Sequence, residues 1–215
     1  MNTFARIARF ALGLSVLAGT IAAGANAQPT EAWEIGPVIA GRNYSVGMPP
    51  TLEPTREGPG FTFPTAGEGH VHYVSVRANP LAGAARIVMR YRIDAPRGTR
   101  FVAQEQPERP ATVSLYLQRR GDSWSGKRHP FHRWYAPSPS VRELAPGRYE
   151  IAVSLTDGGW TSVMGKPAGD NPEAFARALV DADRIGFVFG TSQARGHGVY
   201  ATAPARFTLL DFQLI

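Results

Sequence analysis

Short runs in which apolar and polar residues alternate recur along the chain from residue 70 to residue 215. In residues 85–94, ARIVMRYRID, the odd-numbered positions from 87 to 93 are all apolar, whereas Arg90 and Arg92 fall on the opposite side. This two-residue period is typical of β-strands with one buried face, and β-branched and aromatic residues favour strands. Gly, Pro, Asn and Asp separate the runs. The pattern predicts strands within residues 70–78, 85–94, 111–120, 131–136, 147–157, 160–165, 184–190 and 205–215.

One segment has a helical period instead. In residues 170–183, DNPEAFARALVDAD, Phe175, Leu179 and Val180 recur at three- to four-residue spacing. Pro172 fits the first turn of a helix after a capping Asn171. The segment therefore predicts a single short helix that packs against the strands.

Residues 28–69 are rich in Pro and Gly but also carry many apolar residues, among them Trp33, Phe61 and Phe63. We expect an extended segment that packs over the fold, contributes one or two edge strands, and is pinned by Trp33. The number of short strands and the regular loops between them indicate a single all-β domain over residues 28–215. Its expected architecture is an antiparallel β-sandwich of the jelly-roll type with one short helix.

The first 27 residues have the layout of a cleaved signal peptide. Arg6 and Arg9 precede an apolar run, and Ala25-Asn26-Ala27 offers small residues for cleavage after Ala27. The run is about 14 residues, shorter than the roughly 20 that span a bilayer. We therefore expect a periplasmic or extracellular protein without a membrane span once the signal is removed.

Composition narrows the function classes. The chain contains no cysteine, which excludes disulfides, thiolate metal sites and cysteine nucleophiles. Removing Arg6 and Arg9 lowers the net charge from +6 to +4, and the remaining arginines are scattered along the chain. This distribution argues against a nucleic-acid partner. Oligomeric state is not indicated by the sequence.

A polar sheet face is the main candidate for ligand binding. Alternation places Arg90 and Arg92 on one face of their strand, and Tyr116 and Gln118 on one face of theirs. If the two strands share a sheet, these side chains line one surface. Aromatic rings stack on the apolar face of a sugar, and Arg and Gln hydrogen-bond its hydroxyls or carboxylates. Decoration of a solvated sheet is the alternative.

Other side chains extend this candidate surface. In the segment 131–136, His132 and Trp134 share one face, and Arg133 and Tyr135 share the other. Whichever face is exposed therefore brings an aromatic ring together with a cation or an imidazole. Trp124 lies in the loop RRGDSWSGK, where exposure and a ligand contact are expected, whereas Trp160 is expected in the core. His197 stands between Gly196 and Gly198, so we expect a loop histidine at the ligand rim. No nucleophile motif accompanies these residues, and we assign no catalytic residue.

Two metal sites are weighed. His70 and His72, two residues apart on a predicted strand, would share a face and would form a transition-metal centre if further ligands lay nearby. The pair resembles the start of a cupin motif, but no carboxylate follows it. Asp211 interrupts the apolar run FTLLDFQLI, where a charged side chain faces solvent or coordinates a cation.

The segments GRYEIAVSLTDGGWTSVMG, PEAFARALVDA, RIGFVFG and ARFTLLDFQLI occur in an order that resembles the galactose-binding-like jelly-roll carbohydrate-binding modules, over residues 147–215. The whole chain is similar in layout to secreted bacterial proteins. The resemblance implies that Tyr116 and Trp134 stack on sugar. It also implies structural calcium at Asp211, with Glu68 as a partner, and no other cofactor.

The leading hypothesis is therefore a non-catalytic secreted or periplasmic module that binds a glycan or polysaccharide through an aromatic and arginine-bearing sheet face. Two alternatives stay open. One is a metal-dependent enzyme centred on His70 and His72, with His132 as a further ligand. The other is a structural protein of the cell envelope.

Overall fold

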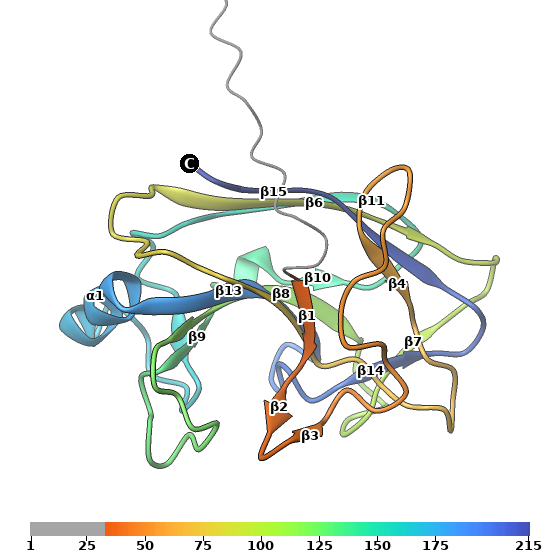
Figure 1. Cartoon of the computed structure of the whole chain (residues 1–215), viewed down its shortest axis with the longest axis horizontal. Helices are drawn as coiled ribbons and strands as arrows, with labels where there is room; N and C mark the ends of the chain where they lie inside the picture. The colour runs from red at the N-terminus through yellow and green to blue at the C-terminus, as the bar shows by residue number, and fades with distance from the viewer. Residues whose placement is uncertain (1–32) are drawn as a thin grey trace, which may run out of the picture.

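Two antiparallel sheets stack face to face in the computed structural model, which describes residues 33–215 (Figure 1). The predicted signal peptide, residues 1–27, lies outside the described residues. The larger sheet has the order β1 (Trp33–Gly36), β5 (Tyr73–Arg77), β13 (Ala182–Gly190), β8 (Thr112–Arg119), β9 (Arg133–Tyr135) and β12 (Thr161–Ser162), and β10 (Arg142–Glu143) pairs with β8. The smaller has the order β11 (Gly147–Ser154), β6 (Arg86–Asp94), β15 (Arg206–Leu214) and β4 (Gly60–Thr62).

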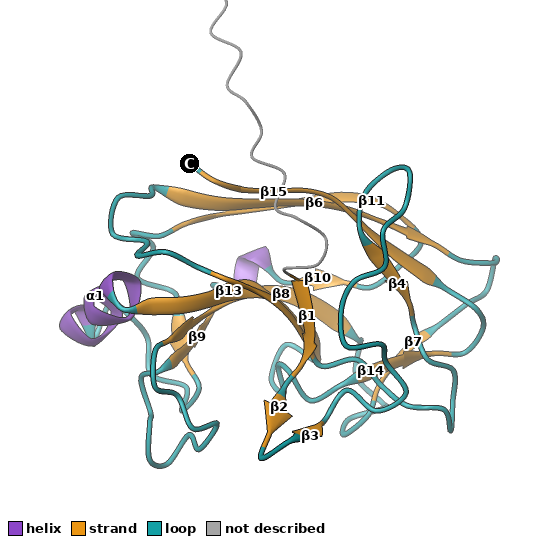
Figure 2. Ribbon diagram, viewed as in Figure 1, coloured by secondary structure: helices purple, strands orange, loops and turns teal. Residues whose placement is uncertain are grey.

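Smaller elements complete the fold (Figure 2). Two small two-stranded sheets are also present: β2 (Val38–Ile39) forms a hairpin with β3 (Arg42–Asn43), and β7 (Phe101–Ala103) pairs with the sequence-distant β14 (Val199–Ala201). A short 3-10 helix, η2 (Ser138–Ser140), follows β9, and the α-helix α1 (Pro172–Val180) leads into β13. The prediction of an all-β antiparallel sandwich with one short helix is confirmed.

The predicted strands correspond to β5, β6, β8, β9, β11, β12, β13 and β15, although β12 is only two residues long. Strands β1 and β4, from the Pro- and Gly-rich segment, each form one edge of a sheet, as expected for that segment, and β12 and β11 form the opposite edges. Trp33 is 1% exposed and touches Phe187 of β13 and Phe212 of β15, so it joins both sheets.

The core lies between the two sheets, and alternation identifies its residues correctly. Ile87, Met89, Tyr91 and Ile93 of β6 are at most 1% exposed. From the facing sheet, Phe187 stacks on Phe207 of β15, with ring centroids 5.1 Å apart. Trp160 is fully buried against Phe175 of α1, which confirms its predicted place in the core.

The seven-stranded sheet is strongly curved. Figure 1 shows β1 and β9 bending away from the four-stranded sheet on either side of β8 and β13, so that the outer face of the larger sheet is concave. We call this outer surface of β5, β13, β8 and β9 the concave face. The outer surface of β6, β15 and β11 is called the convex face. No helix within residues 33–215 is long and apolar enough to cross a membrane.

Candidate functional site

The concave face is built from the side chains of β5, β8, β9 and β13 that alternation turns away from the core. On β8, Val113, Leu115 and Leu117 enter the core, so Ser114, Tyr116 and Gln118 point outward. Register places Tyr116 opposite Tyr135 of β9. Tyr73 lies on β5, which is separated from β8 by β13, and its side chain points to the same face. Its ring meets that of Tyr116 edge to face, with centroids 5.1 Å apart.

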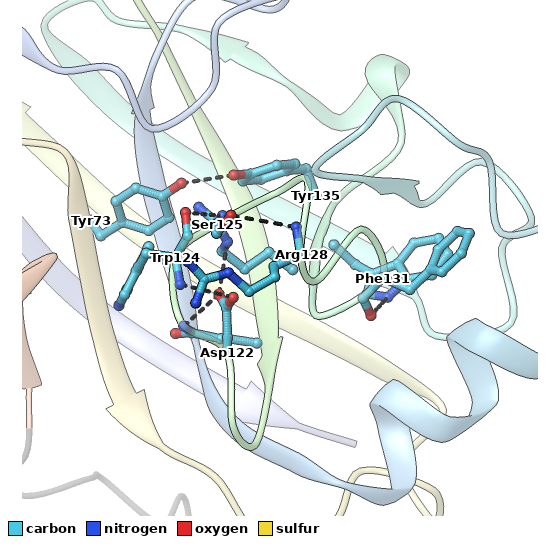
Figure 3. A network of polar contacts seen from close by, with 10 residues as sticks. Tyr73, Asp122, Trp124, Ser125, Arg128, Phe131 and Tyr135 are labelled. Atoms are coloured by element: carbon cyan, nitrogen blue, oxygen red, sulfur yellow. Dashed lines mark hydrogen bonds and ion pairs between the residues drawn. The ribbon is translucent and has the colours of Figure 1, made fainter. Parts of the chain in front are cut away.

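These three tyrosines form an aromatic cluster with Val188. The hydroxyls of Tyr73 and Tyr135 lie 2.7 Å apart and are hydrogen-bonded (Figure 3). Burial raises the pKa of all three phenols. The hydroxyls therefore stay neutral, and they can donate and accept hydrogen bonds. Tyr116, which was expected to stack on a sugar, is fully buried beneath the other two rings, so only Tyr73 and Tyr135 reach the surface of the face.

The loop from residue 120 to residue 132 folds back over this cluster and is held there by Asp122. The Asp122 carboxylate lies 2.8 Å from Arg133 Nε, and its side chain is only 1% exposed. Gln118 Nε2 donates to the same carboxylate at 2.9 Å. The backbone N–H of Trp124 donates to Asp122 Oδ1 at 3.0 Å. A buried ion pair with further hydrogen bonds thus fixes the loop to the sheet.

Trp124 is the half-buried aromatic residue that this loop presents. Its φ of 63° is in the left-handed region, which a bulky residue rarely adopts. The Arg133 guanidinium lies 4.9 Å from the centroid of the Trp124 ring, and Arg133 Nη2 donates to the Trp124 carbonyl at 2.9 Å. The Tyr73 ring meets the indole edge to face at 5.0 Å. The ring orientation is therefore fixed before any ligand arrives.

Two hollows lie on the concave face on either side of the Tyr73–Tyr135 pair. The first, about 200 Å³, has Tyr73, Gln118 and Trp124 in its wall. Its carboxylates are all engaged, because Glu34 pairs with Arg184 at 2.8 Å, Asp183 with Arg77 at 3.3 Å and Asp122 with Arg133.

The second hollow, about 250 Å³, is lined by Tyr135, Arg195, His197 and several small polar residues, among them Ser138, Ser162 and Ser192. Tyr73 therefore lines the first hollow and Tyr135 the second, and the hydrogen bond between their hydroxyls lies where the two hollows meet. An elongated ligand that crossed the tyrosine pair would reach both hollows.

A third hollow, about 490 Å³, lies off the concave face between residues 128–132 and α1. His132 lines it together with His129, and their rings are 4.4 Å apart. Burial, then the neighbouring His129, lowers the pKa of His132. The structure thus places His132 apart from Tyr116 and Gln118.

The predicted joint surface of Arg90, Arg92, Tyr116 and Gln118 does not form, because β6 and β8 belong to different sheets. Arg90 is on the convex face, where it pairs with Glu150 at 2.7 Å and with Asp211 at 3.2 Å. Arg92 pairs with Asp94 and Glu57.

The expected role of Asp211 as a calcium ligand is also replaced by this ion pair. A bulge between Leu209 and Asp211 brings Asp211 opposite Arg90 in the pairing with β6. Glu68 is hydrogen-bonded to Thr65 in a separate turn. Of the two roles expected for Asp211, a solvent-facing side chain therefore describes it better than a calcium ligand.

Trp134 is fully buried, in contrast to its expected place at a sugar-binding surface. Its ring packs edge to face on Phe175 at 4.9 Å, and its indole N–H donates to the Phe131 carbonyl. Alternation correctly placed Trp134 on one face of β9 and its neighbours Arg133 and Tyr135 on the other. The face with Arg133 and Tyr135 is the one that forms part of the concave face.

His70 and His72, the predicted metal-binding pair, have ring centroids 4.6 Å apart. His72 Nδ1 donates to the Gly196 carbonyl at 2.8 Å, and burial lowers its pKa to about 4. No group of three or more His, Asp or Glu side chains able to hold a metal occurs within residues 33–215. His197 lies at the rim of the second hollow, with Nδ1 2.8 Å from Glu105.

Sequence reasoning missed Tyr73, Asp122 and Arg195 as site residues, and it named Arg133 and Tyr135 only as the alternative face of their strand. Alternation contained a signal for the first, because Tyr73 shares a face with Ser75 and Arg77, opposite Val74 and Val76. Asp122 and Arg195 lie in loops, where no period indicates the direction of a side chain.

Comparison with known proteins gives similarity at the level of structure. No family model matches the chain, and no curated protein matches it. Among solved structures, the chain is similar to a protein described as xylan-binding module CBM15, with 12% sequence identity and a TM-score of 0.40 over 84% of this chain and 92% of that chain. Inference about function therefore depends on the side chains of the concave face.

Proposed function

We propose that this protein is a non-catalytic carbohydrate-binding module whose ligand lies across the concave face. The observation that carries the proposal is the arrangement of Trp124 and the Tyr73–Tyr135 pair between two adjoining hollows. Sugars present apolar C–H faces to aromatic rings and hydroxyls to planar polar groups, and the concave face supplies both. Because the ligand would span both hollows, we expect an oligosaccharide or polysaccharide chain rather than a single sugar.

The fixed positions of the polar groups support binding of this kind. Ion pairs and hydrogen bonds already hold Gln118, Arg133 and Arg184 in the free protein. Little side-chain entropy would be lost when a ligand binds such preorganised groups. The first hollow also lacks a free pair of carboxylates, since each of its acids is ion-paired, and a glycosidase would need such a pair.

We also propose export from the cytoplasm, to the periplasm or the exterior, through the signal peptide predicted in residues 1–27. Polysaccharide ligands fit that location. N-terminal sequencing of the protein recovered from its native host would test the cleavage after Ala27.

Binding is tested by affinity electrophoresis and calorimetry of residues 28–215 against a panel of neutral and acidic polysaccharides that includes xylan. We expect at least one ligand to bind, and Trp124→Ala to weaken that binding about tenfold or more, because aromatic anchors dominate such interfaces. Absence of binding to every member of the panel would overturn the proposal.

Phe131→Ala is the matched control, because Phe131 belongs to the same loop but lines the third hollow and points away from the tyrosine pair (Figure 3). We expect this variant to bind normally once its folding has been verified by circular dichroism. If Phe131→Ala lost binding while Trp124→Ala kept it, the ligand would lie in the third hollow and the concave face would be the wrong site.

A further inference from the structure

Arg195 is a partly buried cation whose partners are all neutral. Its Nη1 donates to the Ala136 carbonyl, its Nη2 to Ser138 Oγ at 3.2 Å and its Nε to the Ser192 carbonyl at 3.2 Å. Within residues 33–215, no carboxylate lies within ion-pair distance of this guanidinium.

The other partly buried arginines around the concave face differ in this respect. Arg119 pairs with Asp181 at 2.7 Å, Arg133 with Asp122 at 2.8 Å and Arg184 with Glu34 at 2.8 Å. Each of these charges is thus neutralised within the protein, whereas no carboxylate among residues 33–215 neutralises that of Arg195. A charge withdrawn from water without a partner is unfavourable, and burial accordingly lowers the pKa of Arg195.

The surroundings of Arg195 are suited to a ligand that supplies the missing charge. Arg195 lines the second hollow, whose other walls are mostly neutral hydroxyl groups and backbone. A guanidinium has five N–H donors. Since the three hydrogen bonds to Ala136, Ser138 and Ser192 use three, two donors remain for a ligand. No Asp or Glu of the described residues lines the hollow, and Glu105, which contacts the lining residue His197 at 2.8 Å, is not part of the lining.

We propose that the second hollow binds an anionic substituent of the saccharide, a uronate carboxylate or a sulfate ester, and that Arg195 is the residue that recognises it. This inference rests on the proposed carbohydrate binding and names its ligand class as acidic. Two oxygens of a carboxylate or sulfate match the fork of a guanidinium, and such charge-assisted pairs are stronger than neutral hydrogen bonds.

The test compares each acidic polysaccharide with the same chain after its charge has been removed. Uronate polymers are compared before and after chemical reduction of the carboxyl groups, and sulfated polymers before and after desulfation. We expect the charged form of one of these two classes to bind the wild-type protein about tenfold more tightly than its uncharged form. The class that shows the difference identifies the carboxylate or the sulfate as the ligand group.

Arg195→Gln should abolish this preference while binding of the uncharged chain stays close to that of the wild type. Arg195→Lys keeps the charge and should retain part of the preference. Arg148→Gln is the matched control, because it removes the same charge from an exposed arginine of β11, in the four-stranded sheet.

The possible outcomes separate the two proposals. Equal binding of charged and uncharged chains by the wild-type protein overturns the role of Arg195 and leaves carbohydrate binding intact. Absence of binding to any chain overturns both. Equal losses in Arg195→Gln and Arg148→Gln would indicate diffuse charge attraction, and a parallel loss for charged and uncharged chains in Arg195→Gln alone would indicate that Arg195 only holds its loop in place. Both results would overturn specific recognition.

Discussion

His72 shows at the scale of one residue how the loops around the concave face are held. Since the Gly196 carbonyl can only accept, His72 Nδ1 carries the proton and Nε2 does not. Nε2 is buried without a partner among the described residues. Burial lowers the pKa of His72 to about 4, and the hydrogen bond to Gly196 and the neighbouring titratable groups His70, His197 and Glu105 only modify this effect.

We predict that this histidine makes the protein less stable as the pH falls from about 6.5 to about 4. In this window the unfolded chain binds a proton at His72 and the folded protein does not, so the free energy of unfolding decreases with falling pH, by at most about 3 kcal/mol. Urea denaturation at several pH values would measure this slope. His72→Gln, which keeps a hydrogen-bond donor but does not titrate, should flatten it. Identical slopes for both proteins would contradict the prediction.

Residue-scale reasoning from the sequence identified faces but not their surroundings. Alternation separated Trp134 from Tyr135 and Leu117 from Gln118, and the structure keeps both separations. The face of β9 that became buried was determined by contact with α1, because Phe175 of that helix packs on Trp134. Such a contact joins residues 41 positions apart in the chain, and no local period contains it.

The loop between β13 and β14 is the element that brings Arg195 and His197 to the concave face. Gly196 allows its path, with a φ of 78° and so little space that a Cβ there would lie 2.3 Å from the Tyr73 hydroxyl oxygen. The glycines on either side of His197 thus serve a close approach of the loop to the tyrosine cluster.

Gly196→Ala should therefore destabilise the protein by about 2–4 kcal/mol, because left-handed strain adds to overpacking against Tyr73. The substitution should also weaken the binding of any ligand that contacts Arg195. Gly98→Ala is the matched control, since Gly98 has a φ of 86° but no atom within 4 Å of an added Cβ. That variant should lose only about 1 kcal/mol. Thermal unfolding of both variants measures the difference, and equal losses would show that contact with Tyr73 is unimportant.

Element-scale prediction from the sequence succeeded for single strands and failed for their neighbours. The segments around Arg90 and Tyr116 were correctly identified as strands, but their expected common surface required β6 and β8 to share a sheet. Strand β8 instead pairs with β13 and β9, and β6 with β11 and β15. Antiparallel pairing between distant segments follows from how the whole chain packs, and one sequence shows only the pattern within each strand.

At the scale of the whole molecule, the two outer surfaces have different chemistry. The convex face carries exposed ion pairs around Arg90, whose side chain is 51% exposed. The concave face carries buried aromatic rings, a buried ion pair and the two adjoining hollows. The proposed ligand-binding surface and the surface that carries exposed ion pairs therefore lie on opposite sides of the sandwich.

We accordingly predict that Arg90→Ala has little effect on the stability of the protein or on ligand binding. Exposed ion pairs contribute about 0–1 kcal/mol, so the free energy of unfolding should fall by no more than about 1 kcal/mol. Binding of the polysaccharide ligand should match the wild type, because Arg90 lies in the sheet opposite the hollows. Calorimetry and urea denaturation test both statements. A tenfold loss of binding would instead move the ligand to the convex face.

The positions of β13 and β15 determine when the chain can fold during its synthesis. Strand β13 lies between β5 and β8, and β15 lies between β6 and β4, so each sheet has a strand from residues 182–214 in its interior. Until the ribosome has made these residues, β5 and β8 lack the strand that joins them, and β6 has β11 alone as a partner. Neither sheet can therefore form its full strand order before residues 182–214 have been synthesised, so folding of both sheets depends on segments made late.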